Sequence, residues 1–452
     1  MKNSFEKFND KHTHLVISDY PEITKKGGKN YGIAWYTKQL IEPIASNYNI
    51  KFVVLAEEGT DNKPKTYQDN KILVLRVFKQ KHFSLFPRIL KMLIKFNRIK
   101  KVDVHSEFCA NGGIKNLVLI LPFLLLIKIS GKHITYFAHN VVKDIDSLAP
   151  HLGFKKNSLS VKLINFGLKY YYKILSLLVN RFTVMDEVIY KRLSSIVNPK
   201  KIILSPFWIQ DKQINLSEEN ARQRLDIKKN EFVLLYFGFI TYYKGADWII
   251  KTVKKIRLDK KFRNIRLILA GGEAYSLKEK QHYKIFYQNL TNSIKKDKYI
   301  QITGFVPEKE ISFYFKAADI VIFPYRGIMG GSGSLSHTIY FNKPFLINNN
   351  MQELTQSQTM KKVLAQNKLN SKDIMFSYNY DSFVKHLRII QNKTFIKKLK
   401  NFSKDLSLEK DIKKLIYNCY DNLYREKETT VSYKIAGPLS FLNIKKLYEY
   451  GK

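Results

Sequence analysis

The sequence predicts an α/β protein built from two doubly wound domains, each a parallel sheet covered by helices on both faces. In the first half of the chain, short and almost continuously apolar segments alternate with longer segments of helical periodicity. That alternation is typical of buried parallel strands and their crossover helices. The pattern begins again after residue 230, and 452 residues are enough for two or three domains.

The first predicted domain comprises residues 1–205. Buried strands are expected where apolar residues run continuously, at 14–18, 51–55, 72–77, 102–105, 133–138 and 181–185. Helices are expected between them, at 33–46, 86–100, 114–129 and 159–180.

The second predicted domain comprises residues 206–400. Its strands are expected at 232–237, 265–270, 300–303, 320–323 and 344–347, and its helices at 245–256, 277–296, 308–317 and 334–341. A helical tail is expected over 401–452, with a helix at 408–425, and we expect it to pack back toward the first domain. Because ligands bind at the carboxyl ends of such strands, a cleft between the two domains is the expected site.

Composition excludes several classes of protein. Hydrophobic residues make up 45% of the chain and aromatic residues 13%, which is too much apolar surface for a disordered or linker-dominated protein. Two cysteines cannot form a disulfide framework or a four-cysteine zinc site, so a reducing, cytoplasmic compartment is the expectation.

The formal net charge of +40 is spread over both halves of the chain. Spread charge fits solvated faces, a compositional bias toward lysine, a membrane surface or a polyanion. Nucleic-acid binding is not expected, because no recognisable binding module accompanies the charge.

Membrane attachment is predicted to be peripheral. The longest uncharged apolar run, 117–127, is shorter than the roughly 20 residues of a spanning helix, and the N-terminus lacks the apolar core of a signal peptide. Two stretches, 70–102 and 147–185, contain no acidic residue and carry lysine or arginine at helical spacing beside apolar residues. Such helices bind anionic headgroups, although ordinary surface helices with lysines share the pattern.

Four stretches of the second domain indicate a phosphate-binding site. Gly238 ends a strand, and Lys244 comes just before a helix, where a lysine and a helix dipole can hold a phosphate; an ordinary turn has the same sequence. Strand-end glycines recur at Gly272 and in the run 303–307, where a tight turn or a plain loop is an equally good interpretation.

The fourth stretch, 324–336, has three glycines within four residues at the start of a helix. Free N–H groups in that arrangement form an anion-binding nest, and a diphosphate is a natural occupant. No Gly-Lys-Ser/Thr follows, so the stretch is not a Walker P-loop. No clustered Asp-x-Asp motif appears near it, so neither a metal nor a cofactor is expected.

These stretches, in this order, resemble the second domain of GT-B glycosyltransferases of the large retaining bacterial family. The resemblance is specific over about 230–350, where Tyr314-Phe-Lys-Ala-Ala-Asp319 precedes the strand that ends at Pro324, and it is looser in the first half. There, glycines at 27–28 and the run 31–36 resemble the glycine-rich loop after the first strand, and His139 resembles the strand-end histidine.

The resemblance implies roles for individual residues. Lys244 would neutralise the donor diphosphate, and His139 would face the donor sugar; taken alone, His139 also fits a strand-end histidine with satisfied hydrogen bonds. The predicted donor-binding residues are Gly28, Gly32, Gly238, Thr241, Gly272, Phe305, Val306, Tyr325, Arg326, Gly331, Ser332, Gly333, Ser334 and Leu335.

Two departures from the family pattern matter. Thr241 stands where an arginine usually precedes the lysine by three, and the family's Glu-x7-Glu pair falls on Met329 and His337. No protein nucleophile is evident, which favours front-face transfer assisted by the leaving phosphate.

The expected function is transfer of a sugar, with retention, from a nucleotide-diphosphate sugar to a glycan acceptor, expected to be lipid-linked, in cell-surface polysaccharide synthesis. The expected place is the inner face of the cell membrane. The alternative is a catalytically weakened GT-B subunit that binds nucleotide sugar or supports a partner transferase.

Overall fold

The computed structural model describes residues 2–21, 32–58, 66–68, 71–79, 85–106, 114–146, 149, 154–155, 157–206, 216–274, 277–328, 330–408 and 412–425. The predictions for Gly28 and Met329, and for the end of the tail from residue 426, lie outside these ranges.

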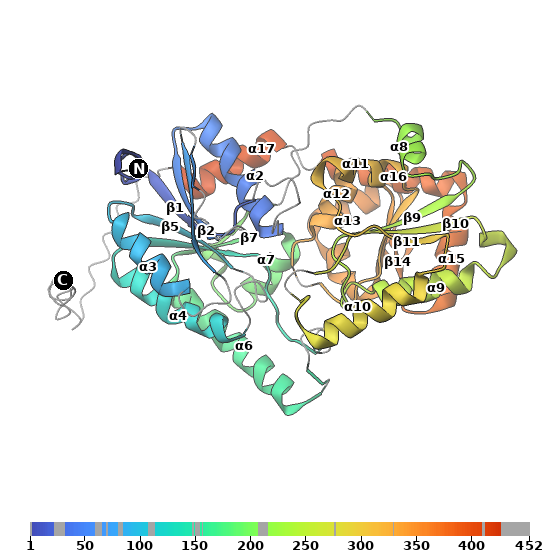
Figure 1. The fold of residues 1–452 in the computed structure, drawn as a ribbon, viewed down its shortest axis with the longest axis horizontal. Coiled ribbons are helices and arrows are strands. Elements are labelled where there is room, and N and C mark those ends of the chain that lie inside the picture. Colours follow the sequence, from blue (N-terminus) through green and yellow to red (C-terminus); the bar gives the residue numbers. More distant parts are fainter. Residues whose placement is uncertain are drawn as a thin grey trace.

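Two separate sheets form the two halves of the molecule (Figure 1). The eight-stranded sheet has the order β3-β4-β2-β1-β5-β6-β7-β8, and the six-stranded sheet has the order β11-β10-β9-β12-β13-β14. All strand pairs are parallel except β3 with β4. The predicted pair of doubly wound α/β domains is therefore confirmed.

The first half of the chain contains all six predicted strands and two more. Its strands are β1 (Thr13–Ile17), β2 (Lys51–Glu57), β3 (Thr66–Gln68), β4 (Ile72–Phe78), β5 (Lys101–Ser106), β6 (His133–Ala138), β7 (Arg181–Val184) and β8 (Ile202–Leu204). Its helices are α1 (Lys2–Phe8), α2 (Gly32–Asn47), α3 (Leu85–Lys95), α4 (Ile114–Ile129), α6 (Leu159–Leu178) and α7 (Glu187–Ser194).

The second half contains the five predicted strands and a short sixth. Its strands are β9 (Phe232–Phe237), β10 (Ile265–Ala270), β11 (Ile300–Ile302), β12 (Ile320–Phe323), β13 (Phe345–Asn348) and β14 (Met375–Phe376). Its helices are α8 (Glu218–Arg224), α9 (Ala246–Ile256), α10 (Gln281–Ile294), α11 (Glu308–Ala317), α12 (Gly333–Tyr340), α13 (Gln358–Gln366), α14 (Ser371–Ile374), α15 (Tyr380–Ile390) and α16 (Lys393–Leu408).

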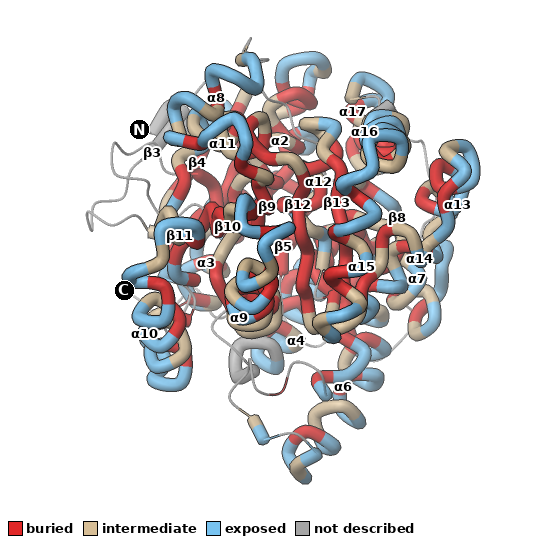
Figure 2. Tube along the Cα trace, turned by 90° about the vertical axis from the view of Figure 1, so that its right-hand side faces the viewer, coloured by how far each residue is buried: buried red, intermediate tan, exposed pale blue. Residues whose placement is uncertain are grey.

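The strands are mostly apolar and buried because both faces of each sheet are covered. All five residues of β1 and all four of β12 are buried, and Figure 2 shows the strands as the buried interior with helices around them. The helices are amphipathic instead: α9 buries Ile249, Val253 and Ile256 against the second sheet and turns lysines outward.

Each sheet has a topological switch point, where the strand order reverses and ligands bind in doubly wound folds. In the first sheet β1 pairs with both β2 and β5, and in the second sheet β9 pairs with both β10 and β12. The carboxyl ends of β9 and β12 lead into two of the stretches singled out in the sequence, at Gly238 and Pro324.

The chain crosses back to the first domain near its end. Helix α16 packs on α12 and α13, whereas α17 (Ile412–Cys419) packs on α2 and continues into a π-helical turn, Tyr420–Tyr424. The Tyr420 ring stacks on Tyr48 with 3.6 Å between centroids. The boundaries at 205 and 400 stay a prediction.

Several expected element bounds are wrong. The helix expected to reach residue 100 ends at Lys95. Strand β5, in the interior of the sheet, begins six residues later, so the chain must turn between the two elements. The helix expected at 277–296 begins at Gln281, and in place of the tail helix expected at 408–425 the structure has α17, Ile412–Cys419, followed by the π-helical turn.

Candidate nucleotide-sugar site

The site is built where the loops after β9 and β12 meet the start of α12. Gly245 makes this arrangement possible, because it begins α9 with a φ of 72° and a Cβ atom there would lie 1.8 Å from the Pro324 carbonyl oxygen. The Lys-Gly pair therefore lets the β9 loop pass directly over the end of β12. Lys244 is held at the switch point as a result.

Lys244, Gly238 and Ser334 converge. A Cβ atom on Gly238 would lie 2.8 Å from Nζ of Lys244 and 3.0 Å from Oγ of Ser334. The Lys244 ammonium also lies 5.4 Å from the centroid of the Tyr325 ring. Within the described ranges no carboxylate pairs with this ammonium.

The start of α12 supplies further positive potential. Ser332 caps the helix, and its Oγ accepts a hydrogen bond from the Leu335 N–H, while the Ser334 hydroxyl donates to the Phe237 carbonyl oxygen at 2.8 Å. The N–H groups of Gly333 and Ser334 have no acceptor among the residues that the structure describes. They and the helix dipole face the same region as Lys244.

The first domain closes the other side of this region. Asn140 forms an isolated antiparallel bridge with Gly330, and a Cβ atom on Gly330 would lie 2.3 Å from the His139 carbonyl oxygen. Arg192 ties the same loop down, because its Nη1 atom donates to the carbonyl oxygens of Val141 and Ile328. The two predicted halves of the site therefore meet in space.

His139 is buried at the carboxyl end of β6. Its Nε2 lies 3.1 Å from Nδ1 of His105, and the Tyr36 ring packs edge-on against it with 5.2 Å between centroids. Burial lowers the pKa of His139 to about 3 and holds the pKa of His105 well below its usual value. Both imidazoles are neutral near pH 7.

The remaining predicted residues fall into two groups. Gly272 and Phe305 lie together, since a Cβ atom on Gly272 would be 3.0 Å from the Phe305 nitrogen; the Phe305 side chain is half exposed, and Val306 follows it in the chain. Gly32 begins α2, one turn before Tyr36.

Three predicted residues have surroundings that the sequence did not indicate. The Arg326 guanidinium is bonded to both carboxylate oxygens of Asp247, at 2.8 and 2.7 Å, which favours a role in holding the loop over direct contact with a donor. The hydroxyl groups of Thr241 and Tyr325 are buried without a hydrogen-bond partner among the described residues.

His337 occupies an aromatic cluster rather than a polar site. Its ring packs against Phe237, Phe315 and Phe341, and burial lowers its pKa to about 4. A carboxylate in this position would be surrounded by aromatic rings.

Two residues of the site were missed by sequence reasoning. Asp186 caps α7, and its Oδ2 lies 3.6 Å from the position that a Cβ atom on Gly331 would take. His105 contacts His139 directly. The signal for His105 was available, because it is a polar residue at the carboxyl end of an apolar strand.

No group of three or more His, Cys, Asp or Glu side chains with metal-binding proximity occurs in the described part of the chain. Among the same residues, no helix has both the length and the apolar character that a membrane crossing requires.

Comparison with known proteins agrees with this architecture. Residues 217–351 match the family model of glycosyl transferases group 1. An uncharacterized glycosyltransferase of Methanocaldococcus jannaschii is 26% identical over 277 residues, which cover 58% of this chain and 62% of that protein. A second one from the same organism is 29% identical over 25% of this chain and 26% of its own length. The chain thus spans less than two thirds of the length of either relative.

Solved structures share the whole fold at low identity. Sucrose-phosphate synthase from Thermosynechococcus elongatus has a TM-score of 0.65 at 11% identity, covering 91% of this chain and 98% of its own. Anabaena HepE, solved with UDP and glucose, has a TM-score of 0.61 at 11% identity and coverages of 91% and 99%. The fold is GT-B. Within that fold, residues 217–351 are similar to group 1 glycosyl transferases.

Proposed function

We propose that this protein transfers a sugar from a nucleotide-diphosphate sugar to a glycan acceptor. The observation that carries the proposal is the convergence of Lys244 with the start of α12. Among the described residues, the Lys244 ammonium has no carboxylate partner and the first N–H groups of α12 have no acceptor. These are two positive features side by side, and an anion of the size of a diphosphate offsets both.

The chemistry that this arrangement supports is departure of the diphosphate. The bond between the anomeric carbon and the diphosphate oxygen breaks, and the oxygen gains negative charge that Lys244 and the α12 N–H groups stabilise. The acceptor hydroxyl attacks the same face of the sugar and gives its proton to the leaving diphosphate. Retention follows, and no protein nucleophile is required.

His139 is proposed to face the donor sugar. A neutral imidazole offers one donor and one acceptor without an opposing charge beside the diphosphate. The bound UDP in the HepE structure supports a nucleotide diphosphate as the ligand class for the shared fold. The base is proposed to stack near Phe305, with Val306 supplying main-chain hydrogen bonds.

The acceptor is proposed to be lipid-linked and the protein to bind an anionic membrane surface. Helix α6 carries six exposed apolar side chains at intervals of three or four residues, and Figure 1 shows this helix extending beyond the rest of the first domain. These side chains are Leu159, Leu163, Phe166, Tyr170, Ile174 and Leu177, hereafter the α6 stripe. Exposed lysines at 162, 169 and 173 flank the stripe, and α6 contains no acidic residue.

Helix α4, which packs on α6, extends this surface. Its side chains at Val118, Leu125, Leu126 and Ile129 are each more than 40% exposed. An exposed apolar face of this extent on a folded domain marks an interaction site, and the lysines favour an anionic lipid surface as the partner. A membrane-binding surface and a lipid-linked acceptor are both features of enzymes that build cell-surface polysaccharide, so we propose this process for the protein.

Ligand-dependent thermal stability tests the donor site. UDP, GDP, ADP and the corresponding nucleotide sugars are added singly, and at least one nucleotide diphosphate is expected to raise the melting temperature in proportion to the logarithm of its concentration. Inorganic phosphate is the matched small anion. If no nucleotide raises the melting temperature more than phosphate does, the donor assignment is wrong.

A second candidate function is a catalytically weakened subunit that binds nucleotide sugar and supports a partner transferase. It is favoured by His337, which occupies the aromatic cluster where the family has a carboxylate. Hydrolysis or transfer of a bound donor by the purified single chain would exclude it.

A further inference from the structure

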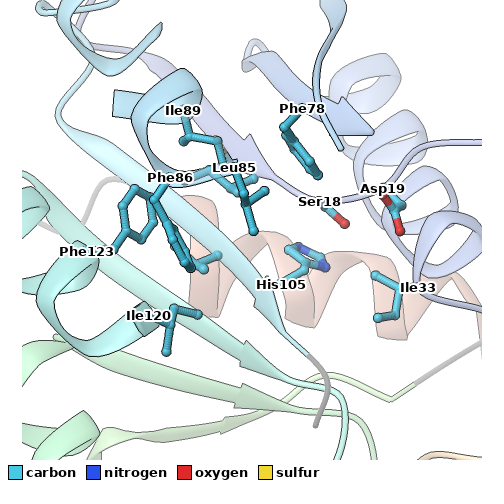
Figure 3. Close-up of a pocket in the computed structure, with 12 residues that line it drawn as sticks. Ser18, Asp19, Ile33, Phe78, Leu85, Phe86, Ile89, His105, Ile120 and Phe123 are labelled. Carbon is cyan, nitrogen blue, oxygen red and sulfur yellow. The ribbon is translucent and has the colours of Figure 1, made fainter. Parts of the chain in front are cut away.

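The first sheet has a pocket of its own at the switch point between β1 and β5 (Figure 3). Its volume is about 40 Å³, and it lies at the carboxyl ends of β1 and β5. Phe86 and Ile89 of α3 and Ile120 and Phe123 of α4 form one side, whereas His105 and Ser18 lie on the other. Ligands of doubly wound domains bind at this place in the fold.

The polar end of the pocket has an unused hydrogen-bond acceptor. The Thr37 hydroxyl donates to the Ile33 carbonyl oxygen at 2.9 Å, so Nδ1 of His105, 3.3 Å from that hydroxyl, carries the hydrogen. The Nε2 atom of His105 is then an acceptor. It has no partner within the described residues, although the residue is 95% buried. Buried polar atoms are seldom left in that state.

We propose that this pocket binds the hydrocarbon segment of the acceptor that adjoins its head group, and that His105 Nε2 accepts a hydrogen bond from a head-group hydroxyl. The proposal rests on the proposed function. His105 links the pocket to the donor side, because its other ring nitrogen lies 3.1 Å from His139.

An apolar occupant fits the walls better than a sugar ring does. The sides formed by α3 and α4 offer no hydrogen-bond partner, and sugar hydroxyls buried there would lose their bonds to water without replacement. The enclosed volume is close to that of one water molecule in the liquid, about 30 Å³, so it accepts one or two methylene or methyl groups.

Helix α4 lies between the pocket and the exposed apolar surface of the first domain. This helix buries Ile120 and Phe123 at the pocket and exposes Leu119 and Leu126 on its other face. One helix therefore separates the pocket from the apolar surface proposed to meet the membrane. A hydrocarbon chain is long enough to reach from the pocket to this surface, whereas a compact aromatic group is shorter than the width of one helix, about 10 Å.

Uncharged amphiphiles test the pocket without engaging the diphosphate site. Binding of octyl β-D-glucoside, below its aggregation concentration, is measured by saturation-transfer NMR and titration. Methyl and phenyl β-D-glucoside are measured in the same way for comparison. We expect octyl glucoside to bind at least tenfold more tightly than either. Equal affinity of phenyl glucoside overturns the assignment of an aliphatic chain.

A pair of variants on α3 locates the binding site. Ile89→Trp fills the pocket and is expected to weaken octyl glucoside binding at least tenfold. Ile94→Trp makes the same change on the exposed face of the same helix and is expected to leave binding unchanged. Equal effects of the two variants, or none from Ile89→Trp, overturn the proposal.

Thermal shift with a nucleotide diphosphate shows whether each variant is folded. Should Ile89→Trp fail this check, Ile120→Phe in the pocket is compared with Ile94→Phe on the exposed face of α3, with the same expected outcomes. The two proposals fail separately. Loss of the nucleotide shift in the parent protein removes the donor assignment, whereas loss of chain-length dependence removes the pocket assignment.

Discussion

The Nδ1 atom of His105 lies 3.1 Å from the Nε2 atom of His139, and the two histidines come from the ends of neighbouring strands, β5 and β6. The His105 ring is fixed by stacking on Phe137, with 4.1 Å between centroids and 11° between planes. The hydrogen on Nδ1 of His105 is shared between the Thr37 hydroxyl oxygen at 3.3 Å and Nε2 of His139 at 3.1 Å, so Nε2 of His139 is an acceptor and the neutral form of that ring is favoured. His105 is thus a positioning residue for His139.

Replacing His105 by Phe keeps the stacked ring and removes the hydrogen bond to His139. We expect kcat with a competent donor and acceptor to fall about tenfold, with the KM for the donor unchanged. Loss of the donated hydrogen also raises the pKa of His139, so the acid limb of the pH–activity profile moves to higher pH. An unchanged profile would show that the pair serves only packing.

Removal of the ammonium group tests the diphosphate site directly. Lys244→Ala deletes a charged contact of the kind worth about 1.5–3 kcal/mol, so affinity for a nucleotide diphosphate is expected to fall roughly 10- to 150-fold. The free energy of unfolding without ligand should change by less than about 1 kcal/mol, because within the described residues the variant loses a contact with the Tyr325 ring and no ion pair. Lys251→Ala, at an exposed position of α9, is the control.

Titration with a nucleotide diphosphate, followed by calorimetry or thermal shift, measures the change in affinity separately from the change in stability. Similar nucleotide affinity in the Lys244 and Lys251 variants would remove Lys244 from the site.

The contact between the two domains leaves no room for a side chain at Gly330. The methyl group of Gly330→Ala would lie 2.3 Å from the His139 carbonyl oxygen, and neither backbone can move without opening the bridge at Asn140. Overpacking of this kind costs about 1–3 kcal/mol, so the melting temperature is expected to fall. Gly167→Ala, in an open position within α6, is expected to keep or raise it.

Turnover of Gly330→Ala is expected to decrease along with stability, since the bridge sets His139 against the α12 loop. A variant as stable and active as the parent protein would mean that this loop contact is not maintained in solution.

How much of the fold and of the candidate site could be predicted from the sequence depends on how far apart in the chain the interacting residues are. Apolar runs such as 232–237 predicted the strands, because burial on both faces of a parallel sheet leaves a local pattern. The glycines and Lys244 were found because turn geometry and helix starts are also local. The contact of His139 with His105, by contrast, is set by the pairing of β5 with β6, which no local pattern specifies.

The same limit explains Arg326 and His337. The family resemblance placed Arg326 among the donor-binding residues, but its partner Asp247 lies 79 positions earlier in the chain. The sequence shows a histidine at position 337 but not its surroundings, because the three phenylalanines around it come from β9, α11 and the end of α12. Tertiary packing decides the role of both side chains.

His337 is also expected to make stability depend on pH. Its pKa is about 4 in the folded protein and about 6.5 in an unfolded chain, so between these values the unfolded state binds the extra proton. Stability therefore falls as the pH decreases from 6.5 toward 4. From pH 7 to pH 5 this one group should contribute a loss of about 2 kcal/mol.

His337→Leu removes that contribution. Urea unfolding at pH 7 and pH 5 is expected to show a smaller loss in the variant than in the parent protein. His282→Leu, at an exposed position of α10, serves for comparison and should leave the loss unchanged. Equal losses in all three proteins would contradict the burial of His337.

Membrane attachment is expected to depend on the α6 stripe. The double variant Leu163→Ser/Phe166→Ser removes two side chains that are 63% and 69% exposed, so the fold loses little packing. Each side chain contributes about 1.5–3 kcal/mol when it enters an apolar phase, and binding to phosphatidylglycerol vesicles should fall at least tenfold. Salt should weaken binding of the parent protein, because the flanking lysines attract the anionic lipid.

The control is Leu258→Ser, which changes a side chain that is 80% exposed in the second domain. Vesicle co-sedimentation is compared with size-exclusion chromatography, since a stripe with this spacing can also pair with a second helix. If the double variant converts a dimer to a monomer without changing vesicle binding, the stripe is a protein interface. Loss of vesicle binding at constant size, with Leu258→Ser behaving as the parent protein, identifies it as the membrane-binding surface.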